Sequence, residues 1–100
     1  MGQPFIAGLD LEVKDVSNVA HVLWFFGYYN EGTEPGHFVQ SLLRAISRAD
    51  VENRGRLSLG FPELVNLMHI AGQEPWGIEW MRRKVIDARV AAGQARDGIS

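Results

Sequence analysis

The chain of 100 residues has ten basic and twelve acidic side chains, 46% hydrophobic residues and no cysteine. This composition predicts one globular domain with a single core, and it excludes disulfides, thiolate metal sites and a disordered chain. A net charge of −2 disfavours non-specific nucleic-acid binding, which usually needs a basic excess. We expect a cytoplasmic protein without a signal peptide, lipid anchor or membrane span.

The N-terminal third predicts an extended arm followed by an aromatic helix. Apolar and charged residues alternate from Leu9 to Lys14, so we expect residues 1–14 to be extended. A helix is predicted over residues 16–29, with Asp15 or Ser17 as its N-cap. Its apolar side chains lie on nearly every side and must be covered on every side. A β-strand over residues 22–26 is the alternative, because these residue types also favour strands.

The rest of the chain predicts three or four more helices, which makes the fold class all-α with four to five short helices around the aromatic first helix. After a loop over residues 30–36, apolar residues at helical spacing predict a helix over residues 35–49. Asp50 either caps a short helix over residues 51–59 or lies within one continuous helix. Two helices follow, over residues 62–71 and 75–92. They are ended by Gly72 in the left-handed conformation and by Gly93, and a disordered tail over residues 94–100 comes last.

A resemblance to known proteins rests on two segments: FFGYYNEGTEPGHF, at residues 25–38, and RLSLGFPELV, at residues 56–65. They resemble segments of small helical proteins encoded by actinobacterial phages and prophages, over roughly residues 20–72. The resemblance implies a phage or prophage origin. A protein of that origin would be located in the cytoplasm of the host bacterium. It assigns no activity and no functional residues.

The sequence contains fragments of catalytic or metal-binding patterns but no complete set. Glu34 and His37 match one Glu-x-x-His element, with Glu31 nearby, yet a helical di-iron site needs a second such element. Acids at the start of a helix explain these residues more simply. His21 and His69 lie among apolar residues and are interpreted as hydrogen-bonded core histidines. We therefore expect no enzyme activity, no metal and no cofactor.

A helix-turn-helix regulator of DNA is the alternative functional hypothesis. Residues 62–92 form two predicted helices joined by a short connection containing Gly72, which is the spacing of such a motif. The side chains that would contact phosphates are Arg82, Arg83, Lys84 and Arg89. Glu74 and Glu79 oppose this interpretation, because they would face DNA at the start of the recognition helix.

Protein association is the principal hypothesis, because a 100-residue monomer can hardly bury aromatic side chains that point to every side of one helix. Tyrosine and tryptophan are also enriched at interface hot spots. The partner-binding residues predicted on the first helix are Trp24, Phe25, Tyr28 and Tyr29, and a second patch on the last helix consists of Trp76 and Trp80. We expect a homodimer first and a host protein as a further partner, with no role for a membrane.

Overall fold

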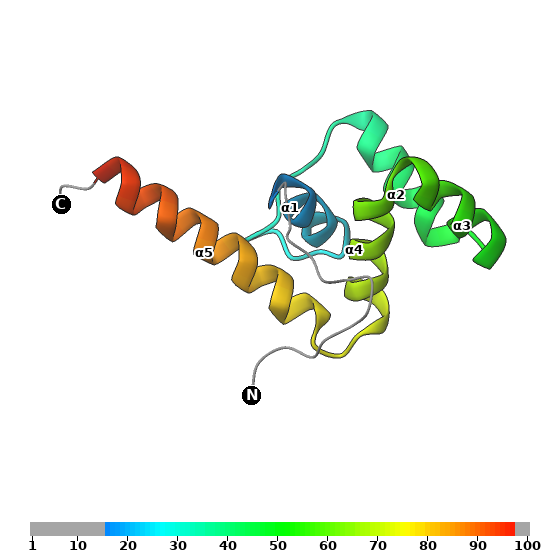
Figure 1. Ribbon diagram of the computed structural model, residues 1–100. Coiled ribbons are helices and arrows are strands. Elements are labelled where there is room, and N and C mark those ends of the chain that lie inside the picture. Colours follow the sequence, from blue (N-terminus) through cyan, green and yellow to red (C-terminus); the bar gives the residue numbers. More distant parts are fainter. Residues whose placement is uncertain (1–15, 98–100) are drawn as a thin grey trace.

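A computed structural model describes residues 16–97, and within this range the chain forms five helices and no strand (Figure 1). They are α1 (Val16–Phe25), α2 (His37–Arg48), α3 (Val51–Gly60), α4 (Pro62–Gln73) and α5 (Gly77–Asp97). The all-α prediction is confirmed. The predicted extended arm lies outside the described residues.

Two helices, α1 and α4, form the centre of the molecule. Helix α4 packs against each of the other four helices, and α1 packs against α2, α4 and α5. The core side chains of α1 are aliphatic: Val19, Val22 and Leu23 are fully buried. Their burial stabilises the fold by roughly 1.5–3 kcal/mol for each side chain. The first helix is therefore central, as predicted, but its aliphatic residues make it so and α4 shares the role.

Helix α1 ends at Phe25, so the predicted boundary at residue 29 is wrong and Tyr28 and Tyr29 are not helical. Gly27 has a φ of 91°, the only positive φ within residues 16–97. Its N–H donates to the carbonyl of Trp24 at 3.0 Å, and the Tyr28 N–H donates to the carbonyl of Leu23 at 3.0 Å. These two bonds form a Schellman motif, which turns the chain out of the helix. The alternative strand over residues 22–26 is also wrong.

Helices α2 and α3 are separate, which decides between the two predicted alternatives. Ala49 is extended, with φ −74° and ψ 139°, and the Asp50 carboxylate accepts a hydrogen bond from the Asn53 N–H at 2.8 Å. Asp50 is thus the predicted N-cap of α3. No residue of α3 is buried.

Helix α4 continues through Gly72 to Gln73, so the predicted left-handed cap at Gly72 is wrong. The connection to α5 is short, and α5 starts at Gly77 rather than Pro75. A Cβ atom at Gly77 would lie 1.9 Å from the Ile70 carbonyl oxygen, so only glycine permits this close crossing.

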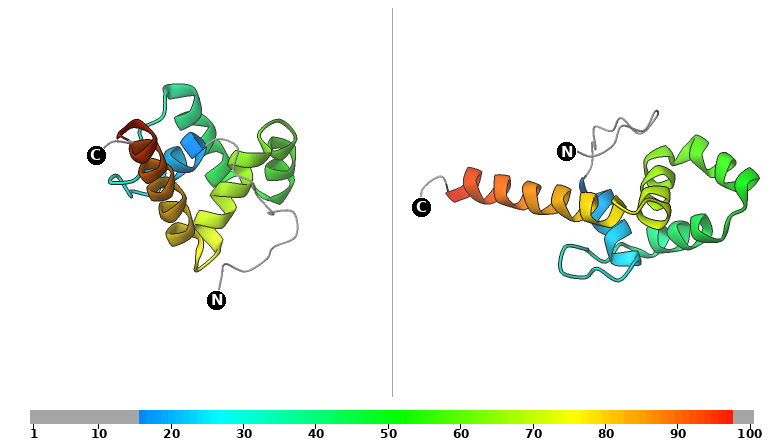
Figure 2. Two further views of the ribbon diagram at one scale, coloured as in Figure 1. Left: turned by 60° about the vertical axis from the view of Figure 1, so that its left-hand side comes forward. Right: turned by 90° about the horizontal axis from the view of Figure 1, so that it is seen from below.

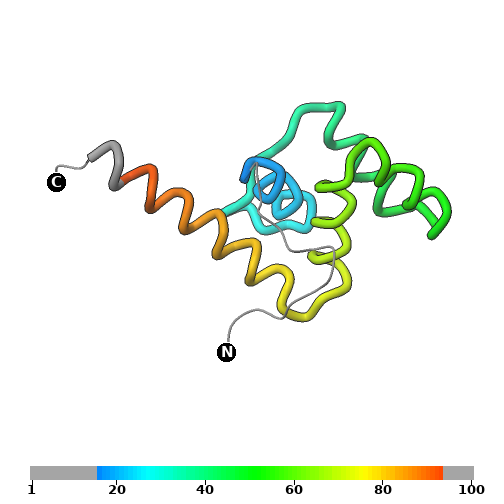
Figure 3. Tube along the Cα trace, viewed as in Figure 1, coloured from blue at the N-terminus to red at the C-terminus, as the bar shows by residue number. Residues whose placement is uncertain are grey.

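Helix α5 has two unlike halves. Its first half contributes Trp80, Met81 and Val85 to the core. Its second half extends away from the other helices as a single rod, and residues 89–92 are exposed (Figures 1 and 2). The helix passes the predicted end at Gly93 and reaches Asp97. The same trace is visible in Figure 3, where α5 leaves the four-helix body beside α1.

Candidate protein-binding surface

Three exposed aromatic side chains follow α1 within one short segment, residues 26–33, which we call the aromatic loop. Tyr29 is 67% exposed, Tyr28 40% and Phe26 37%. The Tyr29 ring lies against the half-buried ring of Trp24, with centroids 6.2 Å apart. The loop thus presents adjacent aromatic rings to solvent, next to the end of a buried helix.

An ion pair fixes the middle of the aromatic loop to α5. Arg82 Nε donates to Glu31 Oε1 at 2.9 Å, and Arg82 Nη2 lies 3.5 Å from Glu31 Oε2. The Glu31 side chain is only 13% exposed, so the pair is partly shielded from water. The hydrogen bond and the charge of Glu31 raise the pKa of the Arg82 guanidinium, which therefore stays charged.

Hydrogen bonds to and from the loop backbone hold the same loop at two further points. Arg89 donates to the carbonyl of Asn30 at 3.0 Å and to the carbonyl of Glu31 at 3.1 Å. The Thr33 N–H donates to the carbonyl of Ala20, inside α1, at 3.1 Å. A Cβ atom at Gly32 would lie within 3 Å of backbone atoms of Trp24 and Tyr28, so the loop lies directly against α1. The loop backbone is therefore held in place although its rings are exposed.

Between the loop and α5 lies a hollow of about 280 Å³, lined by Gly27, Tyr28, Tyr29, Asn30, Glu31 and Arg82. Its lining is more polar than apolar and combines two tyrosines with the Glu31–Arg82 ion pair. A partner side chain seated there would meet hydrogen-bonding groups beside tyrosine, a residue type that is enriched at interface hot spots.

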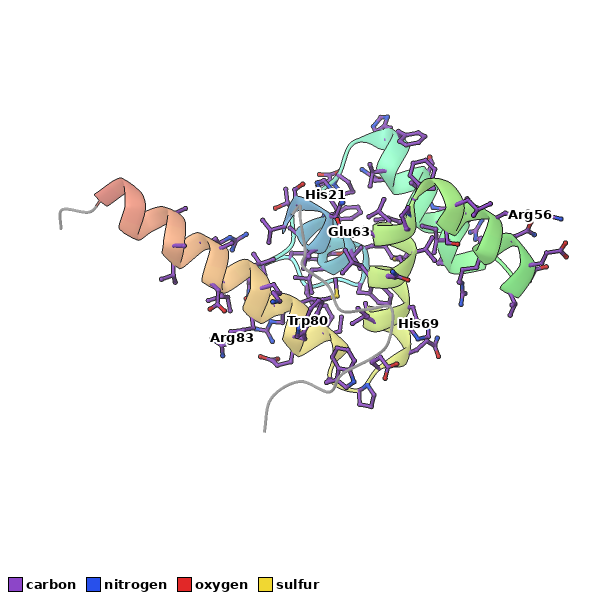
Figure 4. All side chains as sticks on the ribbon, viewed as in Figure 1. His21, Arg56, Glu63, His69, Trp80 and Arg83 are labelled. Carbon is purple, nitrogen blue, oxygen red and sulfur yellow. The ribbon has the colours of Figure 1, made fainter. Side chains whose placement is uncertain are left out.

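The six residues predicted from the sequence to bind a partner do not share one surface. Tyr28 and Tyr29 are exposed and Trp24 is half-buried beside them, whereas Phe25 packs against the core. The two tryptophans of the second predicted patch do not form an exposed surface. Trp80 is 9% exposed and lies between α5 and the other helices (Figure 4), and the half-buried Trp76 meets it edge-on at 6.1 Å. The predicted apolar face of the last helix is thus used for the core.

The four basic residues of the alternative DNA-binding hypothesis have different environments. Arg82 and Arg89 hold the aromatic loop, and the Lys84 Nζ lies 5.3 Å from the centroid of the Trp80 ring. Arg83 is exposed and points away from the helical body (Figure 4). Sequence analysis missed the loop-holding roles of Arg82 and Arg89, because their contacts join residues 51 to 59 positions apart.

The described histidines and acids have separate partners and environments. Within residues 16–97, no three His, Asp or Glu side chains are placed to hold a metal ion. Glu31 binds Arg82, and Glu34 accepts a hydrogen bond from Gln40 at 3.4 Å. His69 is not a core residue: its side chain is 44% exposed and lies 3.5 Å from Glu74.

His21 is half-buried, and its Nδ1 has no hydrogen-bond partner among the placed side chains. The prediction that His21 is a hydrogen-bonded core histidine is therefore not supported for that nitrogen. No helix within the described range has both the length and the apolar character needed to cross a membrane.

None of the protein-family models matches the sequence, and no curated protein or solved structure matches the chain. The resemblance to phage and prophage proteins is untested by these comparisons and stays a prediction.

Proposed function

We propose that the protein acts by binding another protein through the aromatic loop, and that its first partner is a second copy of itself. The observation that carries the proposal is the combination of exposed Tyr28 and Tyr29 rings with a backbone fixed by Arg82, Arg89 and Thr33. A loop that is already ordered loses little conformational entropy on binding, so more of its contact energy becomes affinity.

The position of α5 supports a second copy as the partner. Its projecting half is adjacent to the aromatic loop, since Arg89 contacts the loop backbone, and the next residue, Val90, is 51% exposed. Helices owe most of their stability to tertiary packing, yet beyond the contacts of Arg89 the next three residues of the described chain, 90–92, are exposed. A twofold partner would cover the loop and this half-helix together, through one self-complementary surface.

Light scattering on a dilution series tests this proposal. The wild-type protein should have the mass of a dimer, and replacing Tyr28 and Tyr29 by Ala should produce a monomer with unchanged helicity. Phe38→Ala is the matched control, because Phe38 is an aromatic residue of α2 with nearly the same exposure, 66%, as Tyr29. If both variants have the mass of the wild type, the aromatic loop is not the association surface.

DNA binding by α4 and α5 is the second candidate function. One observation supports it: α4 and α5 are joined by three residues and cross closely at Gly77. It predicts salt-sensitive binding to duplex DNA that Arg83→Ala weakens. Arg83 is the discriminating residue because its removal leaves the aromatic loop contacts intact. Flat titrations at low salt would exclude this function.

A further inference from the structure

A second cavity, independent of the aromatic loop hollow, lies where α2, α3 and α4 meet. It has a volume of about 280 Å³, and its lining residues are Phe26, Ile46, Ser47, Arg54, Met68, His69, Gly72 and Gln73. That volume is at the lower limit of small-molecule pockets, so it fits a compact ligand and excludes a nucleotide.

Arg54 gives this cavity an unneutralised positive charge. Arg54 is half-buried on α3, and it forms no ion pair with any acid of residues 16–97. Of the five N–H donors of its guanidinium, the described chain accepts one, from Nη2 to the Ala49 carbonyl at 3.3 Å. Its Nε is shielded from solvent without a partner. Withdrawing a charge from water without a counter-charge is unfavourable, so an anion bound here would stabilise the site.

Arg56, two residues further along the same helix, is a paired surface arginine and serves as the comparison for Arg54. Arg56 is exposed, and its Nη2 lies 2.6 Å from Glu52 Oε2. It does not line the cavity. The unpaired arginine is thus the one at the cavity, while its exposed neighbour is paired.

The remaining walls of the cavity combine apolar and polar residues. Ile46 and Met68 belong to the buried core, and the Phe26 ring lies 3.6 Å from the place that a Cβ atom at Gly72 would occupy. His69, Gly72 and Gln73 are the exposed residues of α4 at this site, and His69 points away from α4 on the side facing α3 (Figure 4). A ligand for these walls needs an apolar body as well as an anionic group.

We propose that this cavity binds a small carboxylate with an aromatic or branched apolar body. The carboxylate would pair with the unused N–H groups of Arg54, because a planar guanidinium matches a carboxylate in geometry and charge. The apolar body would lie between Phe26, Ile46 and Met68. A free phosphate is a poorer occupant, since it would leave these apolar walls uncovered.

The experiment titrates isotope-labelled protein with 3-phenylpropionate and, separately, with the neutral 3-phenylpropanamide, and follows the backbone amides by NMR. We expect saturable shifts at Ser47, Met68 and Gly72, with the acid binding at least about tenfold more tightly than the amide. Arg54→Gln should abolish this preference. Arg56→Gln, which removes the same charge from the same helix, should preserve it.

Equal affinity for acid and amide would overturn the proposal, as would an unchanged preference in Arg54→Gln. Absence of saturable shifts up to millimolar concentration, or shifts confined to other residues, would also overturn it. If Arg54→Gln does not fold, Arg54→Lys replaces it and should weaken the acid preference, because the ammonium cannot form the two parallel hydrogen bonds. The comparison of acid with amide on the wild-type protein is decisive without either variant.

Discussion

The aromatic loop and helix α3 both expose large apolar side chains, yet they are held in the fold in opposite ways. Val51 and Leu59 of α3 are each 87% exposed, more than Tyr29 of the loop. The polar contacts of α3 are local: Asp50 caps it, and Arg56 pairs with Glu52 one turn away. The loop is fixed instead by α5, through residues more than fifty positions away in the sequence.

This difference shows that the exposure of an apolar side chain and the fixing of the backbone that carries it are separate properties. Scattered apolar side chains on a surface are normal and need no functional explanation. A loop whose backbone is fixed from two helices while its rings stay exposed is different, because the fixing contacts keep a set of aromatic rings in one arrangement. The comparison therefore favours the aromatic loop, rather than the exposed apolar side chains of α3, as the proposed association surface.

The largest expected effect comes from Gly77→Ala, which breaks the support of the aromatic loop. The new Cβ atom would overlap the Ile70 carbonyl oxygen, so α4 and α5 must move apart. We expect a loss of about 3 kcal/mol or more in the free energy of unfolding, measured by urea denaturation. Gly93→Ala in the same helix is the control, because a Cβ atom there meets nothing within 4 Å. Equal stability of the two variants would contradict the close crossing.

Gly32→Ala should displace the aromatic loop itself. The added atom would lie 2.5 Å from the Tyr28 carbonyl oxygen and 2.6 Å from the Trp24 nitrogen. We expect a destabilisation of about 1–3 kcal/mol together with a loss of association. Gly55→Ala in α3 is the matched substitution: it has open space and a helical position, so it should stabilise by about 0.5–1 kcal/mol. A stable, associating Gly32→Ala variant would show that the loop does not lie against α1.

Asp50→Ala tests whether α3 depends on local contacts. Removal of the N-cap should cost about 1 kcal/mol, because the Asn53 N–H loses its acceptor. Hydrogen exchange should become faster in α3 while the aromatic loop remains protected. Faster exchange in both regions would mean that the loop is not held independently of α3.

Glu31→Gln is expected to have the smallest effect on global stability and a local effect on the loop. It weakens the hydrogen bond and removes the charge of Glu31, which together raise the pKa of Arg82. An interaction that raises the pKa of a cation in the folded state stabilises the fold at every pH below the ordinary pKa of arginine. This stabilisation is lost only as the pH rises through the folded-state pKa. Raising the pH from neutral to mildly alkaline should therefore leave the loop protected, whereas Glu31→Gln should speed hydrogen exchange at Tyr28 to Gly32. Unchanged exchange in the variant would contradict the role of the ion pair.

The sequence predicted the helical elements because their signals are local. Apolar spacing defined α2, Pro62 marked the start of α4, and Asp50 acted as the cap that its residue type suggested. Gly27 was a readable signal that sequence analysis missed, since a glycine after an apolar helix is a common C-terminal stop. Gly72 was over-interpreted, because a glycine inside a packed helix gives the same local pattern.

The candidate surface could be predicted only in part. Tyr28 and Tyr29, two of the predicted partner-binding residues, are exposed, but the burial of Trp80 in the core depends on how α5 crosses α4. The pairing of Glu31 with Arg82 depends on the same crossing. No spacing rule joins residues so far apart in one chain, so such contacts emerge only from the three-dimensional arrangement.

The most direct test of the central claim is an isotope-filtered NMR measurement on a mixture of labelled and unlabelled protein, which detects contacts between two copies of the chain. We predict contacts from the Tyr28 and Tyr29 rings of one copy to the aromatic loop or to Val90 of the other. Intermolecular contacts that involve Phe38 or Leu59 instead, or no such contacts at high protein concentration, would contradict the assignment of association to the aromatic loop.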